Sequence, residues 1–415
     1  MPARSCSIRF LSPLLLALPQ LLGAPLSGCV GYQADSSDAQ SIAAEVLSRK
    51  GGRFTIDEAI SLAWRQNPEL RALEARARAA GAASTVPILV MGEWRSRGDD
   101  IGLMTDPIAL LGLGSRGAAI DQADARQVEA VATLATARWR TAAAVVEAFA
   151  IDAALATLAV PDLALDTRAF ERAGLASPIA SSQLRAAQAR ADSERVELDR
   201  MRADDHARLR QLLGLPRDTK LALSPLPPNW LVQPNGTDAE LLSRPDLALA
   251  LARFRTADAD FYKAVTDQYP SFQIGPVISL KSDPLEAMGL LQLPIGMHGL
   301  AEAARERRQA ARDDLENALL AAGREATLAD QELAGATALV AATAGELQAS
   351  TTSLAAARAA IAVEVDAFAP FADTARMLLR DTMEHRLAKV ALARARVARA
   401  QAYGWPRCAA TEHGS

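Results

Sequence analysis

Three glycines in the segment LLGLGSRGAAIDQ have the spacing of a loop that binds the phosphates of a dinucleotide. Gly112, Gly114 and Gly117 follow a short apolar run and precede a helical pattern, which is the context in which backbone N–H groups cradle a pyrophosphate. That chemistry requires a second strand and an acidic ribose partner about 20 residues further on. The helical pattern instead continues well past that point. We therefore interpret the glycines as a joint between a strand and a helix.

The histidines do not have the spacing of a metal-binding or catalytic site. They are scattered along the chain, and none has a Cys or a second His three or four residues away. We therefore predict no enzymatic activity, no metal and no cofactor. The formal net charge is −4, with acids and bases interspersed. Because a nucleic-acid-binding protein would show a basic stripe, we also predict no nucleic-acid partner.

The first residues have the pattern of an export signal that ends at a lipidated cysteine. Arg4 and Arg9 precede an apolar stretch that ends in LSGC, so that residues 1–28 would be removed and Cys29 would be acylated. Val30, in place of Asp, favours sorting to the outer membrane. More than one acyl chain would make the anchor to outer-membrane lipid durable. The alternative is an ordinary cleaved signal in which the cysteine is incidental.

The rest of the chain consists of two similar halves, which must position any functional residues. Hydrophobic residues make up 50% of the chain but aromatic residues only 4%, which suits long, closely packed helices. The segment NPEL, with Pro68, returns as RPDL, with Pro245. After each segment follow two apolar stretches and a long helical pattern, and each half ends in a second long helix and Gly-x-Pro.

The repeat sets the domain boundaries that we predict: a linker 29–53, a first repeat 54–216, a Pro-rich connector 217–243, a second repeat 244–406 and a flexible tail 407–415. The expected strands lie near 86–94, 107–113, 270–280 and 288–295, with an exposed polar loop between the first two. The expected helices are 56–83, which restarts at Asn67, and the longer helices 116–172, 178–213 and 300–365.

The strand 270–280 has features of a strand that lies between lipid and water. Apolar and polar residues alternate over much of SFQIGPVISL, and its length matches the roughly 9 to 11 residues that a tilted membrane strand needs. Four strands are too few to close a membrane barrel, because the smallest barrels have about eight. Several copies of the chain must therefore share one barrel.

Over roughly residues 54–406 the chain resembles the TolC-like outer-membrane efflux proteins, in particular the lipidated members of the metal and drug exporter branch. The segments that carry the resemblance are FTIDEAISLAWRQNPEL, GSRGAAIDQADARQ, ERAGLASPIASSQLRAAQARAD, LRQLLGLP and RPDLALALARFRTADADF. The resemblance implies a mainly α fold with a small β part. Long antiparallel helices would form a periplasmic α-barrel, and four strands per protomer would contribute to a trimeric twelve-stranded outer-membrane β-barrel.

The same resemblance implies a function and partners. The homotrimer would passively conduct substrates that an inner-membrane pump and a periplasmic adaptor (membrane fusion) protein deliver. The adaptor-docking pattern of the family matches Arg172, Gly174, Leu175 and Ser177 at the first helical hairpin. The alternative for these residues is a tip that merely turns. The second hairpin has no glycine and turns at Pro370.

The family often closes its periplasmic aperture with aspartates after the second tip, but Met377 and Arg380 occupy those positions in this chain. The nearby Asp366, Asp373 and Asp381 are candidate gate residues, with solvation on a helix surface as the alternative explanation.

Two other functions stay open from the sequence. One is a periplasmic coiled-coil lipoprotein without a pore, and the other is the exit duct of a type I protein secretion system. Interrupted Ala-rich patterns and four paired strand candidates favour a channel over a coiled coil.

Overall fold

The computed structural model describes residues 38–83, 91–94, 100–104, 114–156, 174, 177–227, 234–279, 286–292, 298–361 and 368–405. The chain divides into two compact units, residues 1–49 and 50–415. The first contains helix α2 (Ala39–Leu47), which begins with a capping box between Asp38 and Ser41. The predicted signal peptide, Cys29 and the tail 407–415 lie outside the described residues.

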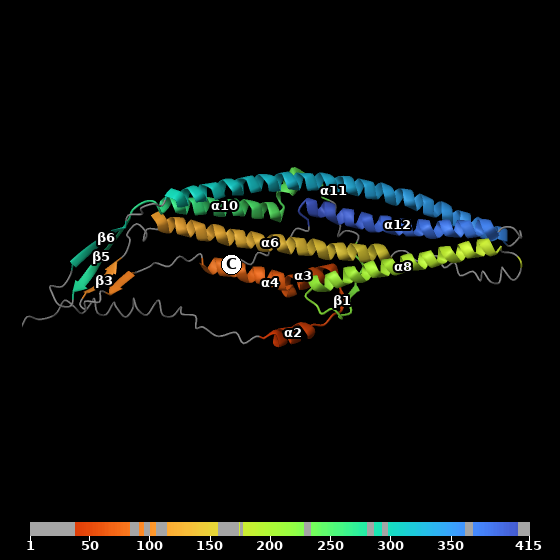
Figure 1. Cartoon of the computed structure of the whole chain (residues 1–415), viewed down its shortest axis with the longest axis horizontal. Helices are drawn as coiled ribbons and strands as arrows, with labels where there is room; N and C mark the ends of the chain where they lie inside the picture. The colour runs from red at the N-terminus through yellow and green to blue at the C-terminus, as the bar shows by residue number, and fades with distance from the viewer. Residues whose placement is uncertain are drawn as a thin grey trace, which may run out of the picture. The chain divides into compact units, whose positions relative to one another are not determined.

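Helices make up most of the second unit (Figure 1). They are α3 (Ile56–Gln66), α4 (Pro68–Ala83), α6 (Gly114–Ala156), α8 (Pro178–Leu212), α9 (Asp238–Leu242), α10 (Pro245–Thr266), α11 (His298–Ile361) and α12 (Phe368–Ala402). The 64 residues of α11 span about 96 Å at 1.5 Å per residue. The predicted helices 178–213 and 300–365 agree with α8 and α11, and α6 covers the described part of 116–172. No helix in the described part of the chain has an apolar stretch long enough to cross a lipid bilayer.

Four strands form an antiparallel sheet in the order β2-β3-β5-β6. They are β2 (Met91–Trp94), β3 (Asp100–Met104), β5 (Ser271–Ser279) and β6 (Glu286–Gln292). Strands β5 and β6 overlap the predicted strands 270–280 and 288–295, and β2 is the end of 86–94. A second, parallel pair joins β1 (Arg53–Phe54) to β4 (Ala222–Leu223).

Strand β3 corrects one expectation from the sequence. Its residues belong to the segment that we expected to be an exposed polar loop, whereas the predicted strand 107–113 lies outside the described residues. The stretch DIGLM is too short and too rich in Gly and Asp to show strand periodicity by itself. Its backbone pairs with β2 on one side, where Ile101 lies opposite Trp94, and with β5 on the other, where Ile101 lies opposite Ile278. Pairing on both sides therefore overrides the weak local preference.

The start of α6 shows what the Gly-x-Gly segment does. Gly114 is the first residue of the helix and has a φ of 64°, a backbone conformation that glycine adopts at little cost. Gly117 lies within the first turns of α6, and Gly112 lies outside the described residues. The chain therefore uses Gly114 to enter a helix of 43 residues, in agreement with a joint.

The short helices of each repeat follow one another as the sequence predicts. Thr55 and Glu58 form the predicted capping box at the start of α3. The helix then stops and restarts at Asn67, whose side-chain oxygen accepts the backbone N–H of Glu69 at 2.9 Å. Its amide nitrogen donates to the carbonyl of Leu212, the last residue of α8, at 3.2 Å. Because the last carbonyls of a helix lack partners within the helix, this bond joins the end of α8 to the start of α4.

Both long returning helices end in the same motif. Gly214 and Gly404 have φ values of 64° and 80°. The next residue donates its N–H to a carbonyl five positions back, from Leu215 to Arg210 and from Trp405 to Ala400. These are Schellman ends, so the two halves of the chain repeat in backbone structure as well as in sequence.

Helices and strands are arranged in the same order across this unit. Helix α4 packs on α6, α6 on α10 and α10 on α11 (Figure 1). Along the chain α4 precedes β2, β3 precedes α6, α10 precedes β5 and β6 precedes α11. The helix order therefore matches the strand order β2-β3-β5-β6. Helix α4 with strand β2 lies at one edge of both layers, and α11 with β6 lies at the other.

Two larger apolar clusters, and a smaller one between α11 and the end of α12, hold the long helices together. The first lies where α3, α6 and the end of α8 meet, and it includes Phe149 and Leu209. The second joins the beginning of α8 to α11 and α12 and includes Leu184, Leu354 and Phe371. Helices α10 and α12 both pack along α11, in separate stretches (Figure 1).

Candidate functional site

The residues predicted to dock an adaptor lie just before α8. Gly174 has a φ of 69°, is exposed, and has no atom near the place where a Cβ would lie. Ser177 is exposed, and its carbonyl accepts the backbone N–H of Ser181 at 3.1 Å in the first turn of α8. Arg172 and Leu175 lie outside the described residues. The left-handed backbone at Gly174 therefore gives this position a conformational reason to be glycine.

We expect Gly174→Ala to destabilise the turn by about 1 to 2 kcal/mol, because an L side chain is strained at this φ although space is open around it. Hydrogen exchange of the amides at the start of α8 would measure the effect. Gly174→Asn should lose less, since Asn tolerates the left-handed region. If Ala and Asn behave like the wild type, positive φ is not needed at this position.

An apolar cluster joins the beginning of α8 to α11 and α12. Phe368 and Phe371, in the first turn of α12, lie with ring centroids 6.3 Å apart. Both are buried, together with Leu184 of α8 and Leu354 of α11. The cluster therefore fixes the beginnings of α8 and α12 against the end of α11.

The three candidate gate aspartates have different surroundings. Asp366 lies outside the described residues. Asp373 is exposed and pairs with Arg376 at 3.2 Å, as expected for solvation on a helix surface. Asp381 is buried, accepts a hydrogen bond from the Ser350 hydroxyl of α11 and lies 3.2 Å from the guanidinium of Arg380. Surface solvation is therefore the wrong explanation for Asp381, whose helix face is covered by α11. A gating role for the three stays a prediction.

A second polar contact crosses between α11 and α12. The Nδ1 of His385 lies 3.0 Å from the Oγ1 of Thr343, and both side chains are buried. Burial, and to a smaller extent the charge of Lys389, hold the pKa of His385 below its ordinary value. The imidazole is therefore neutral at pH 7.

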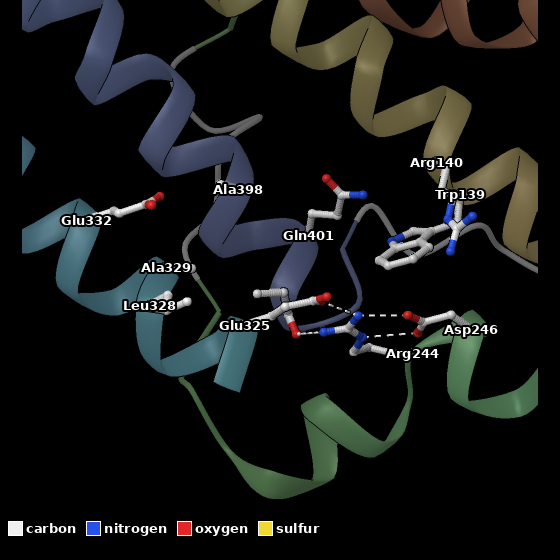
Figure 2. Close-up of a pocket in the computed structure, with 11 residues that line it drawn as sticks. Trp139, Arg140, Arg244, Asp246, Glu325, Leu328, Ala329, Glu332, Ala398 and Gln401 are labelled. Carbon is white, nitrogen blue, oxygen red and sulfur yellow. Dashed lines mark hydrogen bonds and ion pairs between the residues drawn. The ribbon is translucent and has the colours of Figure 1, made fainter. Parts of the chain in front are cut away.

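A buried arginine pairs with two carboxylates where α10 begins and α12 ends. Figure 2 shows the guanidinium of Arg244 between the carboxylates of Asp246 and Glu325, with Trp139 beside it. One Nη atom lies 2.7 Å from each carboxylate, and the other donates to the carbonyl of Ala402 at 3.2 Å. The guanidinium carbon lies 5.6 Å from the centre of the Trp139 ring, within range of a cation–π interaction.

The hydrogen-bond partners of Arg244 stabilise its positive charge. The side chain is only 4% exposed. Burial alone would lower its pKa, but hydrogen bonds to Asp246 and Glu325, and their charges, raise the pKa overall. A surface pocket of about 430 Å³ adjoins the ion pair, with Arg140, Glu332 and Gln401 in its lining (Figure 2). Because both carboxylates bind the arginine, we interpret the group as a structural joint.

This joint is the second-repeat counterpart of Asn67. In each repeat the residue before the proline donates to the final carbonyl of the returning helix: Asn67 to Leu212, and Arg244 to Ala402. Arg244 is not among the residues predicted from the sequence. The alignment of Pro68 with Pro245 contains the signal, because it places Arg244 opposite a predicted helix cap.

Within the described residues, no three His, Cys, Asp or Glu side chains gather as a potential metal site.

Solved structures share this arrangement of helices and strands. The outer-membrane channel OprN is 17% identical over 90% of this chain and 98% of its own, with a TM-score of 0.69. The outer membrane protein VceC of Vibrio cholerae is 16% identical over 84% of this chain and 96% of its own, with a TM-score of 0.64. The CmeC outer membrane channel of Campylobacter jejuni is 13% identical over 97% of this chain and 93% of its own, with a TM-score of 0.64.

No family model and no curated protein sequence matches the chain. The likeness is therefore one of fold, and it extends over nearly the whole length of each of these proteins. Together with the repeat, the helix order and the four-stranded sheet, it shows that this chain has the TolC-like fold of outer-membrane channels.

Proposed function

We propose that the chain is the outer-membrane channel of a tripartite efflux system. A homotrimer would conduct substrates passively from a periplasmic adaptor and an inner-membrane pump to the exterior, with no enzymatic step. The observation that carries the proposal is a fold shared with outer-membrane channels over 84% to 97% of the chain. The strand length of β5, 9 residues, also suits a membrane strand.

The matching edges of the helical layer and the sheet support assembly into a ring. Among the described residues β2 pairs only with β3, and β6 only with β5, so each has a free backbone edge. The α4–β2 edge and the α11–β6 edge differ, so copies would associate head to tail, the contact that closes into a ring. Three copies of a four-stranded sheet would then give a twelve-stranded barrel.

Electron microscopy of the full chain in detergent would test the proposal, with averaged side and end views. A hollow cylinder with threefold symmetry and a detergent belt at one end is the expected result. A solid rod, or a small particle without a belt, would contradict the channel and favour a helical lipoprotein without a pore.

The adaptor would bind at the tip formed by Arg172, Gly174, Leu175 and Ser177. Support comes from the exposed turn at Gly174 and from the apolar cluster that holds the neighbouring helices. The cargo would be selected by the pump, whether metal ion, drug or protein, since the duct only provides the path.

We expect the mature chain to be anchored by acyl groups on Cys29. Mass spectrometry of the N-terminal peptide should show a lipidated cysteine, and Cys29→Ala should remove the modification and release part of the protein from membranes. Cys408→Ala is the matched control and should leave the anchor intact. An unmodified, cleaved N-terminus in the wild type would establish an ordinary signal peptide.

A further inference from the structure

The contacts between α11 and α12 include two buried polar pairs, one at the middle of α12 and one a helical turn nearer to its start. Thr343 and Ser350 lie two helical turns apart on α11, and they bind His385 and Asp381 respectively on α12. All four side chains are buried. One of these groups, the imidazole of His385, changes its charge near physiological pH.

The hydrogen bonds of Thr343 define the state of His385 in the packed helices. The Thr343 hydroxyl lies 2.9 Å from the carbonyl of Leu339, so its single proton is used within α11. It can then only accept a hydrogen bond from His385, and the imidazole must donate through Nδ1–H. A donating Nδ1–H leaves Nε2 as the nitrogen that would take up a proton, and burial of the side chain disfavours the charge that this would create.

The charged groups around His385 oppose a further positive charge. Lys389, one turn later on α12, lowers the pKa of His385 in addition to burial. Arg386 is also buried, and its pKa is lowered by burial and by Arg195 of α8, against a smaller opposite effect of Asp199. On α12, Asp381 is already engaged by Ser350 and Arg380.

Among the described residues, no carboxylate of α6, α8 or α11 forms a hydrogen bond or ion pair with His385. From α6, Glu147 pairs with Arg394 at 3.7 Å, further along α12. From α11 the contact to the imidazole is the Thr343 hydroxyl. An imidazolium at this position would therefore be desolvated beside cations, which is costly.

We propose that His385 and Thr343 form an acid-sensitive latch, which holds α11 against α12 at neutral pH and opens when the imidazole takes up a proton. In the opened state the imidazole meets water and regains its ordinary pKa of about 6.5. The open state then binds a proton more readily than the packed state. The latch is therefore stable above pH 7 and weakens as the pH falls below about 6.5.

The latch has a consequence for conduction that rests on the proposed function. If α11 and α12 belong to the wall of a periplasmic tunnel, acid would loosen the wall around the middle of α12. The latch itself depends only on the packing of this chain.

Hydrogen exchange of the full chain in detergent, followed by mass spectrometry, tests the latch. The peptides that cover Thr343–Ser350 and Asp381–Lys389 are compared from about pH 5 to 7.5, after correction for intrinsic exchange. We expect opening to increase below about pH 6.5, approaching about tenfold per pH unit, because one proton is taken up. A flat profile in the wild type would overturn the proposal.

Three variants separate the latch from other effects of acid. His385→Gln removes the titrating group and should give a flat profile, whereas His298→Gln, at an exposed position in the first turn of α11, should behave like the wild type. Thr343→Val removes the acceptor for Nδ1–H and should raise exchange at every pH. If His385→Gln folds and keeps the full pH dependence, the latch is not at His385. If that variant fails to fold, the pH profile of the wild type and the exchange of Thr343→Val still test the latch.

Conductance in planar lipid bilayers distinguishes the latch from the proposed function. A conductance that increases in acid for the wild type and not for His385→Gln supports both. Acid-dependent exchange without any conductance would support the latch and contradict the channel. Conductance with flat exchange would support the channel and overturn the latch.

Discussion

Arg244→Ala should lower the stability of the folded chain by about 3 kcal/mol, the largest loss that we expect from one charged residue. The guanidinium is 4% exposed and binds Asp246, Glu325 and the carbonyl of Ala402. Its removal leaves a half-buried carboxylate without its cation and a helix-end carbonyl without the guanidinium donor, and such a loss typically costs about 3 to 5 kcal/mol. We expect the lower end because Glu325 is 56% exposed and can be solvated.

An arginine within α10 provides the control. Arg253 is 61% exposed and pairs with Glu129 at 3.7 Å, so that Arg253→Ala should change stability by no more than about 1 kcal/mol. Thermal unfolding in detergent, followed by circular dichroism, would compare the two variants. Equal and small effects would mean that the buried ion pair at Arg244 contributes nothing beyond a surface pair.

We also expect the stability effects of Arg244 and Trp139 to be coupled. Trp139 is buried, donates from its indole nitrogen to the carbonyl of Trp405 at 3.1 Å, and lies beside Arg244. Trp139→Ala should therefore cost about 3 to 5 kcal/mol, and the double variant with Arg244→Ala should lose less than the sum, because the two side chains are in contact. Additive losses in the double-mutant cycle would contradict one connected joint.

The sequence predicted the helices well because their signals are local. Thr55 and Glu58 cap α3, and Asn67 with Pro68 restarts the chain as α4, both within a few residues of sequence. The glycine of each Gly-x-Pro marks the end of a long helix for the same reason, since only a residue that tolerates positive φ completes this end. Such features need no knowledge of what packs against them.

The features that the sequence did not predict depend on partners distant in the chain. Strand β3 forms because β2 and β5 pair with it on both sides. Asp381 and His385 are polar residues one turn apart, as on an exposed face of a helix. They are buried because α11 packs against that face. Arg244 likewise becomes a buried group through Glu325, which lies far along the chain. Local pattern does not contain these contacts, so the polar joints between helices require the structure.

The apolar cluster below the tip gives the second large prediction. Phe371 is fully buried in the first turn of α12 and packs with Phe368 and with residues of α8 and α11. Phe371→Ala should cost about 3 to 5 kcal/mol, through lost burial and the cavity that remains. Because this cluster lies at the end of the helices, we expect the loss to appear first as local opening of the tip.

Limited proteolysis and hydrogen exchange at the starts of α8 and α12 would locate the effect of Phe371→Ala. Phe371→Leu keeps most of the volume and should cost less than about 1.5 kcal/mol. Met377→Ala, at a 47% exposed position of the same helix, should change stability by no more than about 0.5 kcal/mol. If opening is instead uniform along α11 and α12, the tip is not a separate cooperative unit. Local opening with loss of adaptor binding would connect this apolar cluster to docking, since Gly174 lies shortly before α8, one of the helices that the cluster joins.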